Sequence, residues 1–295
     1  MEPLLNLVET RDLKFAVWHW KGGDQAKKIL FVHATGFHAR VWDQVAKLLP
    51  NFDCWAIDMR GHGLSSKPQP PYIWSDFGQD IISIAQNLNL QFDLGIGHSM
   101  GGHSLCSAAS IEPIFKSLLL IDPIIVQKEI YGTIDLKDPH PVLKRRNDWK
   151  SPQEMFDALQ KKKPFHTWNK EVLMDYCFHG LLARADEESS NEPDKSMLLA
   201  CPPAVEGSIY NNSLSNEANP YSYIGKIDIP VRILHAPPDP ERKIEAMVPY
   251  NLGVDFPQGE DVMCSELTHF IAMEAPELVA DHARAMLYSL LNHGF

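Results

Sequence analysis

The chain has 295 residues, of which 44% are hydrophobic and 22% charged, a balance typical of a globular protein. This length accommodates one large α/β domain or a domain with an insertion. The formal net charge of −11 disfavours nucleic acid and anionic membrane surfaces as partners, because both are polyanions. Two short basic runs, residues 144–146 and 161–163, are expected to be solvated faces.

The N-terminal residues lack the basic start and long apolar core of a signal peptide, and no stretch approaches the roughly 18 apolar residues of a membrane span. Five cysteines are an odd number without metal-ligand spacing, which favours free thiols in a reducing compartment. No metal, nucleotide or flavin motif is present. The sequence therefore predicts a cytoplasmic protein with no membrane insertion, no metal and no cofactor.

The first 122 residues alternate between strand and helix patterns. A strand of alternating polarity at 13–20, expected to belong to a hairpin, is followed by buried strands at 28–33, 52–58, 92–96 and 117–122. Helical patterns lie between them at 42–49, 73–90 and 102–110. This alternation predicts a mostly parallel sheet covered by helices on both faces. Ligands bind such sheets beyond the C-terminal strand ends, where His33, Asp58, Ser99 and Asp122 fall.

The pattern changes after residue 122. Residues 123–223 contain aromatic-rich helical pieces and no clear buried strand, which predicts a helical cap above the strand ends. The alternative is an extended set of helices that cover the sheet. Strands return at 231–236 and 260–264, with a helix from about Arg242 between them and a closing amphipathic helix at 277–291. The predicted domains are therefore a core of residues 1–122 and 224–295 and a cap of residues 123–223.

Residues 97–101 read Gly-His-Ser-Met-Gly, a G-x-S-x-G pattern between a strand and a helix. In this context the pattern is a nucleophile elbow, a sharp turn that exposes its serine, here Ser99, at the start of a helix. Strand and helix converge so closely behind the serine that side chains at Gly97 or Gly101 are expected to collide with the backbone. The motif is short enough to recur by chance, so its context carries the argument.

A nucleophilic serine needs a base, and the base needs a carboxylate that orients it. Elbow-type hydrolases present these groups in the order Ser, Asp or Glu, His. Here Ser99 is followed by Asp239, just after a buried strand, and by His269, before the last helix. Asp122, which follows the preceding strand, is the rival carboxylate.

Five segments together resemble the α/β-hydrolase fold serine hydrolases: residues 33–42, 58–65, 97–102, 229–239 and 268–277. The resemblance implies that Ser99 is the nucleophile, Asp239 the acid and His269 the general base. It also implies an oxyanion hole made by the backbone N–H groups of Thr35 and Met100. The chain departs from the family at His33-Ala34, where His-Gly is usual, and at residues 236–239, where Gly-x-x-Asp is usual.

Other residues near these segments are expected to support the site. We interpret three histidines, His33, His62 and His98, as structural hydrogen-bonding groups, and Asp58 and Arg60 as groups that fix the glycine-rich loop. The aromatic residues of the cap are expected mainly to pack, with one or two lining an acyl pocket; they are Trp149, Phe156, Phe165, Trp168, Tyr176 and Phe178.

The resemblance predicts hydrolysis of a small to medium carboxylic ester or lactone through an acyl-enzyme on Ser99. Serine at the elbow disfavours epoxide hydrolases and dehalogenases, which share the fold but carry aspartate there. Hydrolysis of carbon–carbon bonds or thioesters and perhydrolysis stay open, as does a ligand receptor with a slow triad. The expected partner is a small ester-like molecule, and a homodimer is left open.

Overall fold

The computed structural model describes residues 2–134, 140–184, 196–239 and 244–292. Its main feature is an eight-stranded sheet with strand order β1-β2-β4-β3-β5-β6-β10-β11. The strands are β1 (Leu4–Thr10), β2 (Leu13–Trp20), β3 (Lys28–Val32), β4 (Asp53–Ile57), β5 (Leu94–His98), β6 (Leu118–Ile121), β10 (Val231–His235) and β11 (Gly259–Met263). All neighbouring pairs from β4 to β11 are parallel, as predicted.

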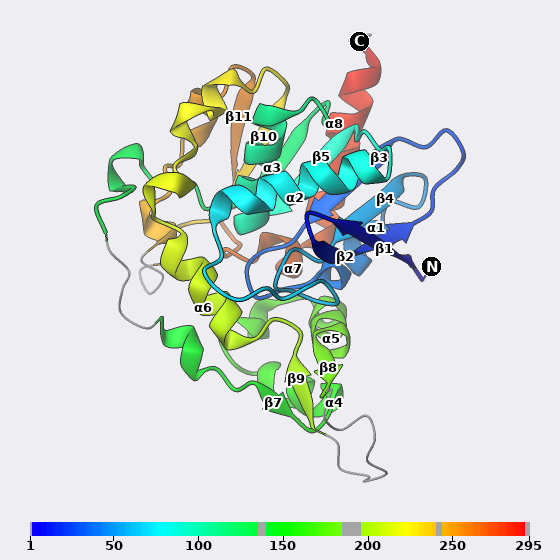
Figure 1. Ribbon diagram of the computed structural model, residues 1–295. Coiled ribbons are helices and arrows are strands. Elements are labelled where there is room, and N and C mark those ends of the chain that lie inside the picture. The colour runs from blue at the N-terminus through cyan, green and yellow to red at the C-terminus, as the bar shows by residue number, and fades with distance from the viewer. Residues whose placement is uncertain (1, 135–139, 185–195, 240–243, 293–295) are drawn as a thin grey trace.

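Helices cover both faces of the sheet because successive strand residues point to opposite sides (Figure 1). Leu30 and Val32 pack with α2 (Trp74–Asn87) and α3 (Met100–Ile111) on one face. Ile29 and Phe31 pack with α1 (Asp43–Lys47) and α8 (Pro276–Asn292) on the other. The predicted mostly parallel sheet with helices on both faces is thereby confirmed.

Short 3₁₀ helices occupy many of the connections. They are η1 (Ala39–Trp42), η2 (Lys128–Ile130), η3 (Pro141–Lys144), η4 (Phe165–Thr167), η6 (Asn216–Ala218), η7 (Pro220–Ser222), η8 (Ile224–Lys226), η9 (Glu245–Met247) and η10 (Leu252–Asp255). The helix predicted from about Arg242 starts outside the described residues, and the described part that follows holds only η9 and η10.

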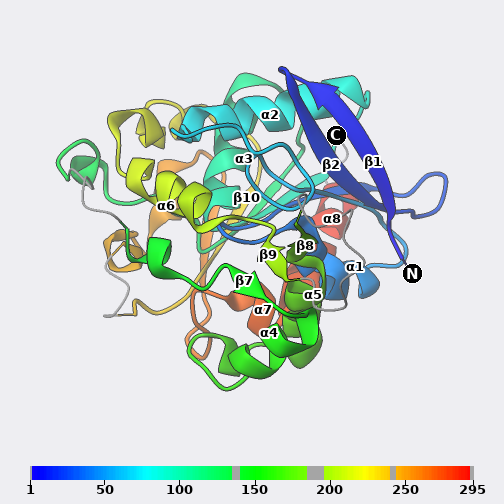
Figure 2. The same cartoon turned by 60° about the horizontal axis from the view of Figure 1, so that its bottom comes forward.

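The segment between β6 and β10 carries α4 (Pro152–Leu159), α5 (Lys170–His179) and α6 (Pro203–Asn212). These helices and their connections gather at one end of the sheet, which comes forward in Figure 2. The segment also holds a small sheet of β7 (Asp148–Trp149), β9 (Met197–Leu199) and β8 (Leu181–Ala183). The expectation of helices without strands is wrong here, because residues 181–182 are in β8.

The N-terminal hairpin differs from the prediction in one respect. The predicted strand at 13–20 is β2, but its hairpin partner is β1, which precedes it. Arg11 and Asp12 form the two-residue turn with φ of 52° and 57°, the left-handed pair typical of a type I′ hairpin. Leu4, Leu5 and Leu7 are all exposed, so β1 lacks the alternation that marks a strand in a sequence.

The last elements of the chain, β11, α7 (Ile271–Glu274) and α8, determine the position of the loop of residues 264–270. The chain passes from β11 through this loop to α7 and then α8, close to the predicted closing helix. All five cysteines lie in the described residues and are free thiols, as predicted. Within the described ranges, no helix is long and apolar enough to cross a membrane.

Candidate active site

Ser99 lies at the apex of the turn from β5 to α3. Its φ of 56° and ψ of −116° are strained for a residue with a side chain, as expected of a nucleophile elbow. A Cβ on Gly97 would lie 2.6 Å from the carbonyl carbon of Gly101, and one on Gly101 would lie 2.2 Å from the oxygen of Val32. These are collisions with backbone, so the predicted need for both glycines has a direct geometric basis.

The carboxylate that contacts His269 belongs to Asp122, the residue directly after β6. Nδ1 of His269 lies 2.6 Å from Oδ2 of Asp122, and both side chains are buried. The backbone N–H of Ala236 donates to the other oxygen, Oδ1, at 3.2 Å. Asp122 has a φ of 41°, a left-handed conformation that is uncommon outside glycine. A strained backbone and two directed hydrogen bonds hold this carboxylate at the histidine.

Asp239 was predicted for this role from the resemblance. The structure places it after β10, in a partly exposed position directly before residues that are not described. Both carboxylates follow neighbouring buried strands, since β6 pairs with β10, so chain order alone does not separate them. Because Nδ1 of a neutral histidine carries a single proton, its 2.6 Å contact favours Asp122 over Asp239.

Two backbone N–H groups flank the serine. The N–H of Met100 is the first of α3, where a helix leaves its donors unpaired. Thr35 lies in the loop after β3 and lines the same cavity as Ser99. Both residues are buried, and within the described part of the chain neither N–H donates to an acceptor. Buried donors of this kind are suited to an oxyanion.

Neutral histidines hold the loop that carries Thr35. The N–H of Gly36 donates to Nε2 of His62 at 3.0 Å, and the N–H of Met59 donates to Nε2 of His33 at 3.0 Å. Burial lowers the pKa of His33 to about 3 and that of His62 to about 4. Both rings therefore stay uncharged at neutral pH and keep an acceptor nitrogen for the loop.

His98 precedes Ser99 and contacts the backbone of His269. Its buried Nε2 donates to the backbone carbonyl of His269 at 2.8 Å, and the two rings lie 4.9 Å apart. Asp58 supports the neighbouring glycine-rich loop, where it accepts from the N–H groups of Ala39 and Leu64. These contacts agree with the structural roles expected for both residues.

Ser99 and His269 open into a cavity of about 140 Å³ between the core and the segment inserted after β6. Six of its thirteen described lining residues are Phe, Trp or Tyr; the lining consists of Ala34, Thr35, Phe37, Ser99, Arg145, Pro164, Phe165, Trp168, Tyr176, Glu206, Tyr210, His269 and Phe270. Of the aromatic residues singled out in the sequence, Trp149 and Phe156 are buried outside this lining and Phe178 is exposed. A larger hollow of about 410 Å³ contains none of the predicted site residues.

Arg145 is a cavity residue that the sequence analysis missed. The run 144–146 was expected to be a solvated face, and Lys144 and Arg146 are indeed exposed. Arg145 instead turns inward, where Nη1 lies 2.8 Å from Oε2 of Glu206 and Nη2 donates to the Tyr176 hydroxyl. A hydrophilic triplet gives no sign of which member faces inward, so no periodicity identified it.

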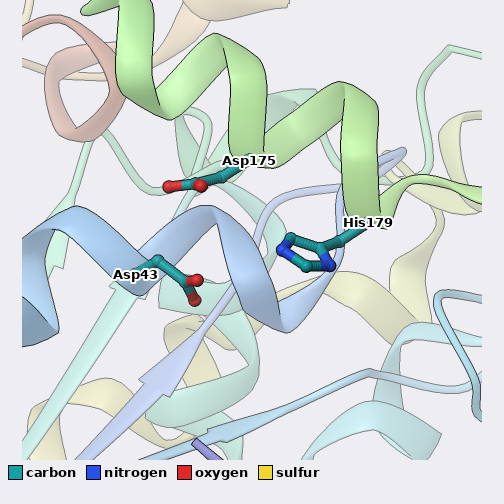
Figure 3. Close-up of side chains that lie close together, drawn as sticks. All are labelled: Asp43, Asp175 and His179. Atoms are coloured by element: carbon teal, nitrogen blue, oxygen red, sulfur yellow. The ribbon is translucent and has the colours of Figure 1, made fainter. Parts of the chain in front are cut away.

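One group of metal-ligand side chains lies elsewhere among the described residues. Donor atoms of Asp43, Asp175 and His179 lie within 4.8 Å of one another, between α1 and α5 (Figure 3). Arg40 already binds both oxygens of Asp43, and Gln44 donates to Asp175. We assign no metal to this group, since its carboxylates are largely engaged.

The fold, the elbow and the histidine–carboxylate pair together define the class of protein. A model of the alpha/beta hydrolase family matches residues 29–282, which is most of the chain. The chain belongs to this family.

Individual relatives are more distant. The chain is 32% identical over 96 residues to 2-(acetamidomethylene)succinate hydrolase of Mesorhizobium japonicum, a stretch that covers 32% of this chain and 34% of that protein. It is 22% identical over 236 residues to non-heme chloroperoxidase CPO-A1 of Kitasatospora aureofaciens, covering 77% and 79% of the two chains. The chain thus spans only about a third of the first of these relatives.

Solved structures show the same fold over almost the whole chain. The crystal structure of E-2-(acetamidomethylene)succinate hydrolase superposes with a TM-score of 0.74 at 18% identity, covering 97% of this chain and 99% of that one. N-formylmaleamic acid deformylase from Pseudomonas putida S16 superposes with a TM-score of 0.65, also at 18% identity, covering 94% and 100%. These levels of identity establish the fold and leave the substrate open.

Proposed function

We propose that this chain is a serine hydrolase that cleaves a small to medium carboxylic ester or lactone through an acyl-enzyme on Ser99. The observation that carries the proposal is the 2.6 Å contact between His269 and Asp122 at a cavity that Ser99 also lines. In this proposal the acid is Asp122 rather than Asp239. Residues 1–122 and 224–295 form the catalytic core, and residues 123–223 form the cap.

The proposed reaction starts with proton transfer from Oγ of Ser99 to Nε2 of His269, while Oγ attacks the substrate carbonyl carbon. Asp122 stabilises the resulting imidazolium through Nδ1. The N–H groups of Thr35 and Met100 donate to the oxyanion. His269 then protonates the leaving alcohol as the ester C–O bond breaks.

Water completes the cycle by the same route. His269 takes a proton from the water as the water oxygen attacks the acyl carbon. The proton then returns to Oγ as the acyl-enzyme bond breaks and the carboxylic acid leaves. The arrangement serves other acyl compounds equally well. Thioesters and the amide-type acyl group that the name deformylase indicates for one structural neighbour are therefore alternatives within the same mechanism.

The test combines a fluorophosphonate probe with p-nitrophenyl esters of graded acyl length, from acetate to octanoate. We expect the probe to label wild type at Ser99 and the rate to peak at a short acyl chain, because the cavity is only about 140 Å³. Ser99→Ala should lose labelling and lose turnover by several orders of magnitude. Absence of labelling in folded wild type would refute the proposed mechanism.

The same experiment separates an enzyme from a receptor. If Ser99 is labelled but no ester, thioester or amide turns over measurably, the hydrolase proposal fails and a slow ligand receptor is favoured. In that case Ser99→Ala should retain ligand binding and signalling, because neither would require the hydroxyl of Ser99.

A further inference from the structure

The catalytic cavity contains a charged cluster that the hydrolytic mechanism does not use. Arg145 is the one lysine or arginine among the described residues that line it. Its guanidinium is held between Oε2 of Glu206, at 2.8 Å, and the hydroxyl of Tyr176. Glu206 and Tyr176 line the cavity too, so the whole cluster belongs to the cavity that Ser99 also lines.

The guanidinium has hydrogen-bonding capacity to spare. Arginine presents five N–H donors, and the contacts with Glu206 and Tyr176 use two of them. Within the described residues the Arg145 side chain makes no third hydrogen bond. Arg145 is about one-quarter exposed while Glu206 is 6% exposed, so the arginine is the more accessible partner.

Stability does not account for this cluster. A buried arginine–glutamate pair is at best about neutral in stability compared with apolar side chains of the same size. Six residues that line the cavity are aromatic, and an apolar residue in place of Arg145 would extend this apolar surface. Burial raises the pKa of Glu206 against the opposing effect of Arg145. Against the opposing effect of burial, Tyr176 and Glu206 raise the pKa of Arg145 as well.

The carboxylate and the hydroxyl instead fix the guanidinium in place. Glu206 is anchored on α6 and Tyr176 on α5, so two cap helices orient one side chain from a third segment. Glu206 offsets part of the positive charge of Arg145, and the N–H donors of Arg145 that remain unused can bind a planar anion. Carboxylate is the anion whose two oxygens match the arginine fork.

We propose that Arg145, oriented by Glu206 and Tyr176, binds a free carboxylate on the substrate, so that the compound hydrolysed at Ser99 is a short acid with a second, acylated or esterified group. This inference rests on the proposed function, because it places its ligand in the cavity of Ser99. The volume of about 140 Å³ lies well below the roughly 300 Å³ at which sites for larger ligands begin. Both groups of the substrate must therefore be close together.

The test compares esters that differ only in charge. The acetyl esters of 3- and 4-hydroxybenzoate are paired with the acetyl esters of the corresponding hydroxybenzamides, and a monoester of adipate is paired with its carboxamide analogue. The measured quantity is the ratio of kcat/KM for the carboxylate over the carboxamide in each pair. We expect wild type to give a ratio of about 10 to 100 for at least one pair, the range typical of a charge-assisted hydrogen bond.

Arg145→Gln should bring that ratio close to one, and Arg145→Lys should leave it intermediate, because lysine retains charge but not the fork. Arg146→Gln is the matched control, since Arg146 is the exposed neighbour that pairs with Glu154 at the surface. It should keep the wild-type ratio. A wild-type ratio at or below one in every pair, or the same ratio in Arg145→Gln as in wild type, would overturn the proposal.

Binding without turnover gives an independent measurement. Calorimetry with glutarate and with glutaramide on Ser99→Ala should show tighter binding of the dicarboxylate, and Ser99→Ala/Arg145→Gln should lose the difference. Equal binding of the two compounds would refute the carboxylate site even if esters are hydrolysed. Absence of fluorophosphonate labelling alongside dicarboxylate binding would instead refute the hydrolase and leave the site standing.

Discussion

The core side and the side of the proposed cap, residues 123–223, hold the polar groups of the cavity at Ser99 by different means. On the core side, side chains contact backbone groups as well as one another: Asp122 accepts from the N–H of Ala236 and contacts His269, and His98 donates to the carbonyl of His269. On the cap side, side chains fix one another, as Glu206 and Tyr176 do for Arg145. Backbone contacts persist through most substitutions, whereas a side-chain cluster changes with any member. In the proposed function, this difference suits a constant reaction on one side and a variable substrate on the other.

The largest effect expected on the core side comes from the acid. Asp122→Asn should lower kcat by about 10³ to 10⁴-fold, because an amide cannot stabilise the imidazolium and favours the wrong histidine tautomer. Asp239→Asn should stay within a few-fold of wild type. Steady-state rates on the best p-nitrophenyl ester decide between them. The reverse order of the two effects would return the role to Asp239.

His98 should have the next largest effect, as a positioning residue. His98→Leu removes the 2.8 Å hydrogen bond to the carbonyl of His269 and should lower kcat by about 10 to 100-fold with little change in KM. His98→Gln, whose amide nitrogen can reach the same carbonyl, should recover much of the loss. If both variants lose activity equally, the histidine serves packing rather than orientation of the base.

Sequence patterns were informative on the core side because Thr35, Ser99 and Asp122 lie just after short buried strands. Ser99 and Met100 were predicted from the elbow motif, and Thr35 and His269 from the family resemblance and the order of the triad; the cavity brings Ser99, Thr35 and His269 together. The acid was harder, since Asp122 and Asp239 occupy equivalent positions after adjacent strands and only the fold reveals which one meets the histidine.

Prediction was weaker for the proposed cap because no hydrophobic pattern in it repeats over a long stretch of sequence. Strands β7, β8 and β9 contain two or three residues each, too few for an alternating pattern. Arg145 is flanked by two exposed basic residues, so its inward orientation depends on Glu206, which is distant in sequence. Side-chain clusters between distant segments leave no local signal.

Acid should weaken the core through its buried histidines. Burial lowers the pKa of four of them from 6.5 to about 3 or 4, namely His33, His38, His62 and His103. Between pH 6.5 and 4 the unfolded chain binds protons that the folded chain does not, so the free energy of unfolding falls as pH falls through this window. Each histidine contributes roughly 1.4 kcal/mol per pH unit.

Urea unfolding at pH 7, 6 and 5 measures this slope. His103→Gln is the informative variant, because His103 donates to the carbonyl of Ala218 away from the catalytic cavity. It should reduce the dependence of the unfolding free energy on pH by the contribution of about one proton, while ester hydrolysis stays near the wild-type rate. A slope that does not change in this variant would show that His103 is protonated alike in both states.

The smallest expected effect lies where the cap helix α5 meets the core helix α1. Burial raises the pKa of Asp175 to about 6, so its ionised form is disfavoured in the folded protein and stability is lost as pH rises through 4 to 6. Asp175→Asn keeps an acceptor for Gln44 and should raise Tm by a few degrees at pH 8, with little change at pH 4. Asp157→Asn, at an exposed site on α4, should change Tm at neither pH.

The position of Asp122 has a consequence for how the chain can be divided. Ser99 and Asp122 directly follow consecutive strands, β5 and β6, so a single strand–helix–strand unit delivers both. In the proposed triad only His269 comes from beyond the cap. The proposed cap is therefore inserted between the segment that carries Ser99 and Asp122 and the segment that carries His269. This arrangement allows the proposed cap to be exchanged as one unit. In the proposed function, a cap grafted from another family member in place of residues 123–223 would change which molecules enter and would leave the groups at Ser99 in place.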